Sequence, residues 1–255
     1  MITRSFLRVS TVFVVALALG ACSRSESYRY KLTLAVNTPA GVKRAASVAE
    51  LRVWDFYFPE RGYGHQLRGE ALYLDLGPGA RPLIALLTSH RPSPCVTCPE
   101  NIWTLDGGPS KRLMSSQYGI APSTDFNDYM ARVARLRGPH SITPNDLPDL
   151  VTFADVNDPK TVIEIDPNHL PATLGPGVSW NEITVESTDE PTTSGIRTKL
   201  PWLPAYFQRN LKLDGSHMYY KNELANQLSW YEFDQSGDLK QNPCDPTKAD
   251  NPCSP

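Results

Sequence analysis

The cysteines with the most suggestive spacing are the pair in Cys95-Val96-Thr97-Cys98. In enzymes that exchange thiols and disulfides, a comparable pair sits at the N-terminus of a helix, which lowers the pKa of the first thiol. Here Pro94 precedes the first cysteine, Pro99 follows the second, and no helical stripe of apolar residues begins there. The spacing leaves thiol oxidoreductase chemistry open as an alternative, but the context favours a structural disulfide.

The first 21 residues have the features of an export signal. Two arginines precede an apolar run over residues 12–19, which is shorter than the about 20 residues of a membrane-spanning helix. The run leads into Leu19-Gly20-Ala21-Cys22, which resembles the lipobox of bacterial lipoproteins. That resemblance implies cleavage before Cys22 and acylation of Cys22 as the lipid anchor. Ser23 resembles the second residue of lipoproteins that reach the outer membrane, which implies the periplasmic face of that membrane as the location.

Cys244 and Cys253 lie in a near repeat of Asn-Pro-Cys within the polar tail over residues 242–255. In an oxidising compartment the four cysteines outside the lipobox suggest two disulfides, with three connectivities. We favour local pairing, because a bridge within the tail would restrict its unfolded state. A zinc site built from four cysteines has less support, since eight residues separate the second pair. The residues that we expect in disulfides are Cys95, Cys98, Cys244 and Cys253.

The rest of the sequence carries no recognisable catalytic or metal-binding pattern. The five histidines are scattered and form no His-x-x-x-His motif, and the Gly-x-Ser-x-Gly and Ser-x-x-Lys signatures of serine nucleophiles do not occur. Asp155-Val156-Asn157-Asp158 is similar to the start of a calcium loop, but Lys160 stands where that loop needs glycine, which favours a turn. We therefore expect no metal and no cofactor, while a hydrolase site assembled from distant residues stays open as an alternative.

Aromatic residues concentrate between residues 202 and 233, which hold 8 of the 24 in the chain. Such rings could form a platform for a glycan or a partner protein, because they bury a large area at little entropic cost. Most of them are nevertheless expected to pack in a core or against proline-rich loops. We select Trp202 and Tyr206 as the best candidates for exposed binding residues.

Most of the remaining chain has the alternating pattern of β-strands. The clearest alternation, over residues 28–36, puts tyrosine, leucine and valine on one face and mostly polar residues on the other. We expect residues 28–88 to form one four-stranded, mainly antiparallel unit in which Gly62 and Gly64 mark a loop. Residues 83–87 form a continuous apolar run that is typical of a central strand. Further strand patterns occur at residues 48–58, 72–76, 150–153, 161–165 and 182–186.

One segment, near residues 124–137, has the single apolar stripe of a helix, with capping residues before it and Gly138-Pro139 after it. The proline-rich stretch Leu200-Pro201-Trp202-Leu203-Pro204 is expected to be neither a regular helix nor a central strand. The pattern predicts a mainly β (α+β) fold, with an antiparallel sheet or sandwich core, one clear helix and long proline-rich loops.

The expected organisation has four parts. The signal peptide spans residues 1–21, a tether spans 22–27, a single β-rich domain spans 28–241 with a potential subdomain boundary near 140–150, and the disulfide-bridged tail spans 242–255. A tether this short reaches at most about 17 Å, so the folded part should lie close to the lipid surface.

Composition limits the classes of partner. Without the leader, which holds two arginines and no acid, the chain has 23 basic and 27 acidic residues and no basic block, which argues against nucleic-acid binding. Two stretches, residues 69–75 and 150–155, resemble stretches of uncharacterised bacterial proteins and imply no activity. We therefore expect a non-catalytic binding or structural module, held on the membrane by its lipid and contacting an envelope protein or a glycan. The alternative is a membrane-tethered enzyme, either the oxidoreductase or the hydrolase named above.

Overall fold

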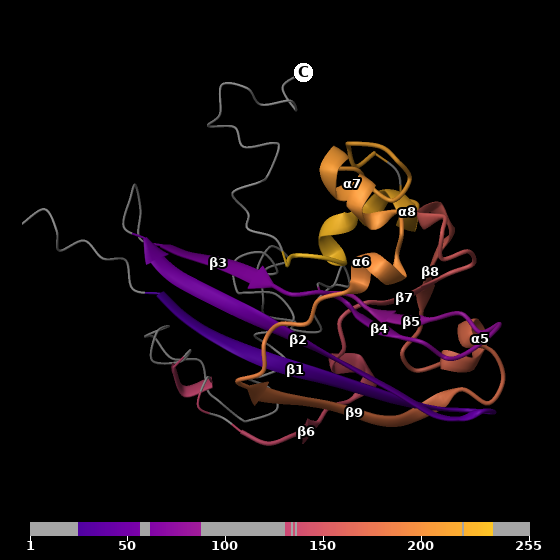
Figure 1. Ribbon diagram of the computed structural model, residues 1–255, viewed down its shortest axis with the longest axis horizontal. Coiled ribbons are helices and arrows are strands. Elements are labelled where there is room, and N and C mark those ends of the chain that lie inside the picture. Colours follow the sequence, from indigo (N-terminus) through magenta and orange to yellow (C-terminus); the bar gives the residue numbers. More distant parts are fainter. Residues whose placement is uncertain are drawn as a thin grey trace, which may run out of the picture.

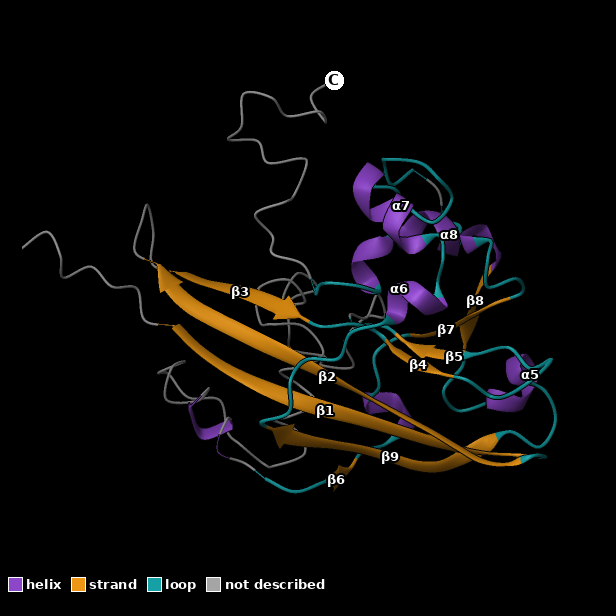
Figure 2. Cartoon of the chain, viewed as in Figure 1, coloured by secondary structure: helices purple, strands orange, loops and turns teal. Residues whose placement is uncertain are grey.

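The structure is a computed structural model that describes residues 25–56, 62–87, 131–133, 135, 137–220 and 222–236. Two antiparallel sheets form its centre (Figures 1 and 2). The first sheet has the order β3-β2-β1-β9-β6, and its strands are β1 (Ser25–Thr38), β2 (Gly41–Phe56), β3 (Gly62–Arg68), β6 (His140–Ser141) and β9 (Ser179–Thr188). The second has the order β4-β5-β7-β8, and its strands are β4 (Leu72–Leu74), β5 (Leu83–Ala85), β7 (Leu150–Phe153) and β8 (Val162–Ile165).

Short helices complete the described part of the chain. Three of them, with the last 3-10 turn, form a layer over the second sheet, at the upper right in Figure 1. The α-helices are α5 (Leu170–Leu174), α6 (Ile196–Lys199), α7 (Leu203–Arg209) and α8 (Leu224–Gln227), and the 3-10 helices are η1 (Pro144–Asp146), η2 (Pro159–Thr161) and η3 (Trp230–Glu232). No helix among the described residues is long and apolar enough to cross a membrane.

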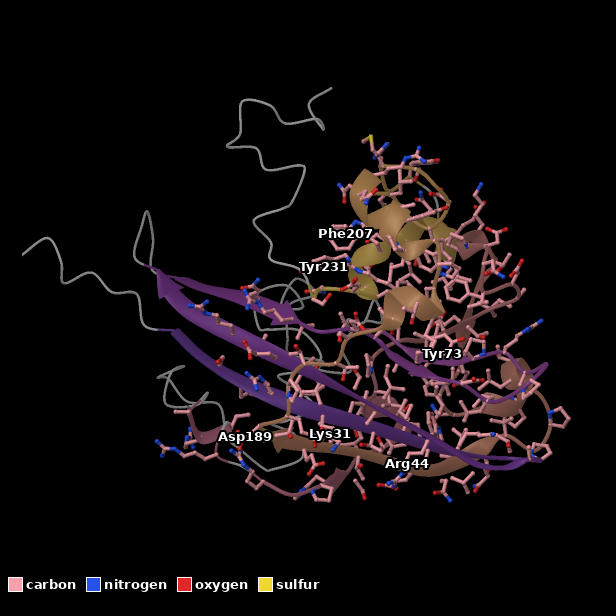
Figure 3. The ribbon with its side chains drawn as sticks, viewed as in Figure 1. Lys31, Arg44, Tyr73, Asp189, Phe207 and Tyr231 are labelled. Atoms are coloured by element: carbon pink, nitrogen blue, oxygen red, sulfur yellow. The ribbon has the colours of Figure 1, made fainter. Side chains whose placement is uncertain are left out.

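The alternation in β1 divides the first sheet into an apolar and a charged face. Tyr30, Leu32 and Leu34 are buried against the second sheet. On the opposite face, Arg29 Nε lies 2.8 Å from Glu50 Oε2 and Lys31 Nζ lies 2.6 Å from Glu190 Oε1. These ion pairs and the register of β1 with β2, unbroken from Ser25 opposite Trp54 to Thr38 opposite Gly41, keep the polar face outward. Figure 3 labels Lys31 on this sheet.

The two inner strands of the second sheet, β5 and β7, are buried on both faces. Leu150 of β7 belongs to the core between the two sheets, whereas Val151 and Phe153 belong to a second core beneath the helical layer. The same holds in β5, where Leu83 faces the first core and Ile84 faces the second. Burial on both faces explains why the sequence of β5 is continuously apolar. The prediction of a central strand there is confirmed, as is the mainly β, antiparallel α+β fold.

The prediction that residues 28–88 form one four-stranded unit is wrong, because their strands belong to two different sheets. The chain leaves the first sheet after β3 and enters the second at β4. Gly69 makes this crossing possible, because its φ is +146° and a Cβ built on it would lie only 2.9 Å from the Cβ of Ala49. The prediction that Gly62 and Gly64 form a loop is also wrong, because both lie in β3, an edge strand where glycine is tolerated.

Two helix predictions have different outcomes. Of the helix expected near residues 124–137, residues 131–133 and 135 are helical, Val133 is fully buried in the core, and residues 124–130 lie outside the described part. The expectation that residues 200–204 form no regular helix holds for residues 200–202, which form a turn, but is wrong for Leu203 and Pro204, because α7 begins at Leu203. Pro204 is tolerated there because amides in the first turn of a helix have no intrahelical acceptor to lose.

Candidate functional site

The loop that joins α7 to α8 presents three consecutive apolar or aromatic side chains to solvent. Met218 is 71% exposed, and Tyr219 and Tyr220 are each 60% exposed. The other large hydrophobic residues exposed within the described ranges, Val42 and Tyr231, belong to other elements. A run of three exposed groups of this size is a feature of contact surfaces rather than of ordinary loops.

A single buried side chain holds this loop in place. Asn226 of α8 is fully buried, and its Nδ2 donates to Asp214 Oδ2 at 2.9 Å, Ser216 Oγ at 2.9 Å and the Met218 carbonyl at 3.1 Å. Its Oδ1 accepts from the backbone N–H of Tyr220 at 2.9 Å. One amide side chain therefore satisfies groups at four positions of the loop, which fixes the backbone beneath the exposed side chains.

The base of the loop is fixed independently. The carboxylate of Asp214 accepts from the backbone N–H of Ser216 at 2.9 Å and from its hydroxyl at 2.6 Å, the geometry of a side chain that closes its own turn. Leu213 is fully buried, and its N–H donates to the Leu228 carbonyl at 3.0 Å. The loop is therefore fixed at its start by buried Leu213, which belongs to the second core, and at its end by Asn226 of α8.

The two aromatic residues selected from the sequence belong to the helical layer, Trp202 as the N-cap of α7 and Tyr206 within α7. The prediction that Trp202 is exposed is wrong, because only 7% of it is exposed. Its ring packs edge-on against Phe153 at 5.8 Å and Phe233 at 5.5 Å, and its Nε1 donates to the Val156 carbonyl at 3.1 Å. An indole buried with its N–H satisfied is a core residue, which removes Trp202 as a binding platform in this structure.

Tyr206 lies next to Trp202, with ring centroids 5.4 Å apart, and it is half-buried. Burial is the main cause that raises the pKa of Tyr206, and the negative charge of Asp158 adds to it. Nearby, the ring of Phe207 packs edge-on against Trp230 at 4.7 Å and lies under the guanidinium of Arg197. Figure 3 shows Phe207 and Tyr231 in this helical layer, away from Lys31 and Arg44 on the first sheet. Most of the aromatic residues between residues 202 and 233 therefore pack in or against the second core.

A second constellation joins two buried carboxylates that are far apart in the sequence. Glu70 and Asp234 form an isolated antiparallel bridge and are 4% and 1% exposed. Glu70 Oε2 accepts from the backbone N–H of Ile196 at 2.8 Å, and Asp234 Oδ2 accepts from Arg197 Nε. Burial raises the pKa of Glu70, against the effect of the backbone hydrogen bonds from Ile196 and Gly195.

The carboxylates of this bridge connect three segments of the chain. The adjoining cavity, of about 20 Å³, is lined mainly by apolar side chains such as Tyr30 and Leu32, together with Ser47 and Glu70. That volume is enough for about one water molecule. The arrangement fastens the start of α6 and the segment after η3 to the link between β3 and β4.

The remaining predicted site residues, Cys22, Cys95, Cys98, Cys244 and Cys253, lie outside the described residues, so lipidation and the disulfides stay predictions. Asp155 closes its own turn, since its Oδ1 accepts from the Asn157 N–H at 2.9 Å, which confirms the turn predicted there. Within the described ranges, no three His, Cys, Asp or Glu side chains gather as a metal ion would require.

Sequence reasoning missed Met218 and Asn226. The available signal was the turn sequence Asp214-Gly215-Ser216 followed by Met218 and two tyrosines, a run with neither the period of a strand nor that of a helix. Nothing in the sequence singles out Asn226, because a buried asparagine has no signature apart from the groups that it contacts.

No protein-family model matches the chain, and no curated protein and no solved structure matches it either. Function is therefore inferred from the geometry of the molecule itself.

Proposed function

We propose that this protein is a lipoprotein of the bacterial outer membrane, anchored through Cys22 to the periplasmic face, that works as a non-catalytic module for binding another envelope protein. The observation that carries the binding role is the loop over residues 214–220, which exposes three large side chains on a backbone fixed by Asn226. The lipobox carries the location.

The fixed backbone supports binding in energetic terms. A loop that must be ordered on association loses affinity to conformational entropy, whereas a loop held in advance by the Asn226 side chain loses less. Full burial of a large apolar side chain contributes about 1.5–3 kcal/mol, so Met218 and Tyr219 together could supply several kcal/mol at a contact. Tyrosine is also a frequent hot-spot residue at protein interfaces.

The composition of the loop favours a protein over a glycan. Methionine has a flexible thioether that adapts to an irregular apolar pocket and lacks the flat face on which a sugar ring stacks. Figure 1 shows α7 and α8 at the upper right, away from the end at which β1 begins. An anchor that precedes β1 would thus leave the loop turned away from the membrane.

Site-specific photo-cross-linking in cells tests the binding role. A cross-linking amino acid at Tyr219 should give a discrete adduct with an envelope protein, and Asn226→Ala should reduce the yield of that adduct several-fold. Val42, which is 56% exposed next to the β1–β2 turn, is the matched control position and should give no such adduct. Equal labelling from both positions, or no adduct at Tyr219, refutes the binding role.

Two measurements test the anchor and the cysteines. Cys22→Ala should release the protein from the membrane fraction. The intact mass of the purified wild-type protein should correspond to a chain that begins at acylated Cys22, with four further thiols that appear only after strong reduction. Ready reduction of one pair would instead favour the oxidoreductase alternative.

A further inference from the structure

The end of the first sheet at which β1 begins gathers aromatic positions from two strands. Trp54 of β2 pairs with Ser25, the first residue of β1, and with Gly64 of β3 on its other side. Two residues further along, Phe56 pairs with Gly62, and between them Asp55 pairs with Tyr63. Three aromatic residues therefore occupy the last three rungs of the β2–β3 ladder, and β2 continues past the point where β1 starts.

The register places this end next to the proposed lipid anchor. Cys22 precedes Ser25 by three residues, which span at most about 11 Å. Directly paired residues on antiparallel strands are about 5 Å apart, so the backbone of Trp54 lies within about 16 Å of Cys22. Acyl chains attached to Cys22 would therefore enter the membrane close to this end of the sheet.

The residue types at this end suit a bilayer surface. Tryptophan and tyrosine are enriched where hydrocarbon meets the polar headgroups, because each has a large apolar ring and one polar group. The opposite end of β2, at its turn with β1 between Thr38 and Gly41, holds proline and alanine instead. Within the β2–β3 ladder, the aromatic residues thus lie only in the three rungs nearest the anchor.

We propose that the end of the β2–β3 ladder, marked by Trp54, Phe56 and Tyr63, rests in the headgroup region of the membrane beside the acyl chains. This proposal rests on the proposed anchoring at Cys22. It gives the protein a second contact with the lipid surface, one that fixes its orientation and keeps the helical layer, with its exposed loop, away from the bilayer.

The test is tryptophan fluorescence of the full, acylated protein reconstituted into vesicles of phosphatidylethanolamine and phosphatidylglycerol, with and without brominated acyl chains. The chain has five tryptophans, so contact at Trp54 should quench about a fifth of the emission if all five emit equally. Trp54→Phe should abolish that quenching. Trp180→Phe is the matched control, because Trp180 pairs with Val36 of β1, about 36 Å along the strand from Ser25, and should leave the quenching intact.

The mass of the same preparation separates the two proposals. Acylated protein whose quenching depends on Trp54 supports the membrane contact. Acylated protein that shows no quenching, or quenching that survives Trp54→Phe, overturns the contact and leaves the anchor in place. A preparation that carries no acyl group on Cys22 overturns both.

Discussion

Replacing Asn226 by alanine should loosen the loop over residues 214–220 and lower the stability of the protein. The Asn226 side chain has two N–H groups that serve three oxygens and one oxygen that serves the Tyr220 N–H. The substitution therefore removes the equivalent of three buried hydrogen bonds, each with a net contribution of about 1 kcal/mol. We expect a loss of about 3 kcal/mol in the free energy of unfolding.

Urea denaturation of the variant measures that loss, and hydrogen exchange localises it. The amide of Tyr220 should lose about a hundredfold of its protection, since 1.4 kcal/mol corresponds to a factor of ten and about 3 kcal/mol to a factor above one hundred. Asn222→Ala is the matched control, because Asn222 is exposed and its side chain accepts only a 3.4 Å contact from the Tyr219 hydroxyl. That control should change stability by less than about 0.5 kcal/mol.

A loss below about 0.5 kcal/mol in Asn226→Ala, together with unchanged exchange at Tyr220, would show that the amide does not hold the loop. A loss confined to exchange, with little change in the urea midpoint, would mean that the loop opens without the rest of the molecule. In that second case the loop is still ordered by Asn226, but it is a separate unit of stability.

Three other perturbations follow from the packing and the buried carboxylates. Trp202→Ala should cost about 3–5 kcal/mol in urea denaturation because the ring is buried, whereas Tyr219→Ala should stay within about 0.5 kcal/mol, and equal effects would contradict the burial described above. Gly69→Ala should cost more than about 1 kcal/mol because its added Cβ meets another side chain at 2.9 Å, whereas Gly79→Ala, where φ is +76° and the space is open, should cost less in the same assay. Glu70→Gln should gain stability relative to wild type as pH rises above 4.5. The raised pKa of Glu70 makes the folded wild-type protein hold a proton that the unfolded chain releases, so the wild type loses stability over this range. A difference in the free energy of unfolding between the two proteins that stays constant from about pH 4 to about pH 8 would contradict this sign.

Most of the strands could be predicted because they leave a local pattern, whereas β3, predicted as a loop, and the two-residue β6 could not. In β1, burial on one face and ion pairs on the other force an alternation that the sequence records directly. In β7 both faces are buried, so the strand appears instead as a short apolar run bounded by turns, and its predicted bounds of 150–153 coincide with those observed. Both signals depend only on neighbouring residues.

The features that sequence missed depend on contacts between distant residues. Glu70 and Asp234 bridge across most of the described chain, and nothing near either residue predicts the other. Trp202 was selected as a candidate for exposure, but its burial is decided by Phe153 and Phe233, which belong to other elements. The crossing at Gly69 likewise depends on the close approach of β2.

The pairing of β1 with β9 has a consequence for how the molecule reaches its folded state. Arg29 lies opposite Thr188, so about 160 residues must emerge before the second edge of β1 finds its neighbour, while the β1–β2 hairpin can close early. Such long-range pairing slows folding, since the entropy of closing a large loop is lost before the strand contacts are gained. During that interval β1 presents an open edge, which is a template for pairing with other chains. A chain exported in an unfolded form would therefore benefit from a holding chaperone until β9 arrives.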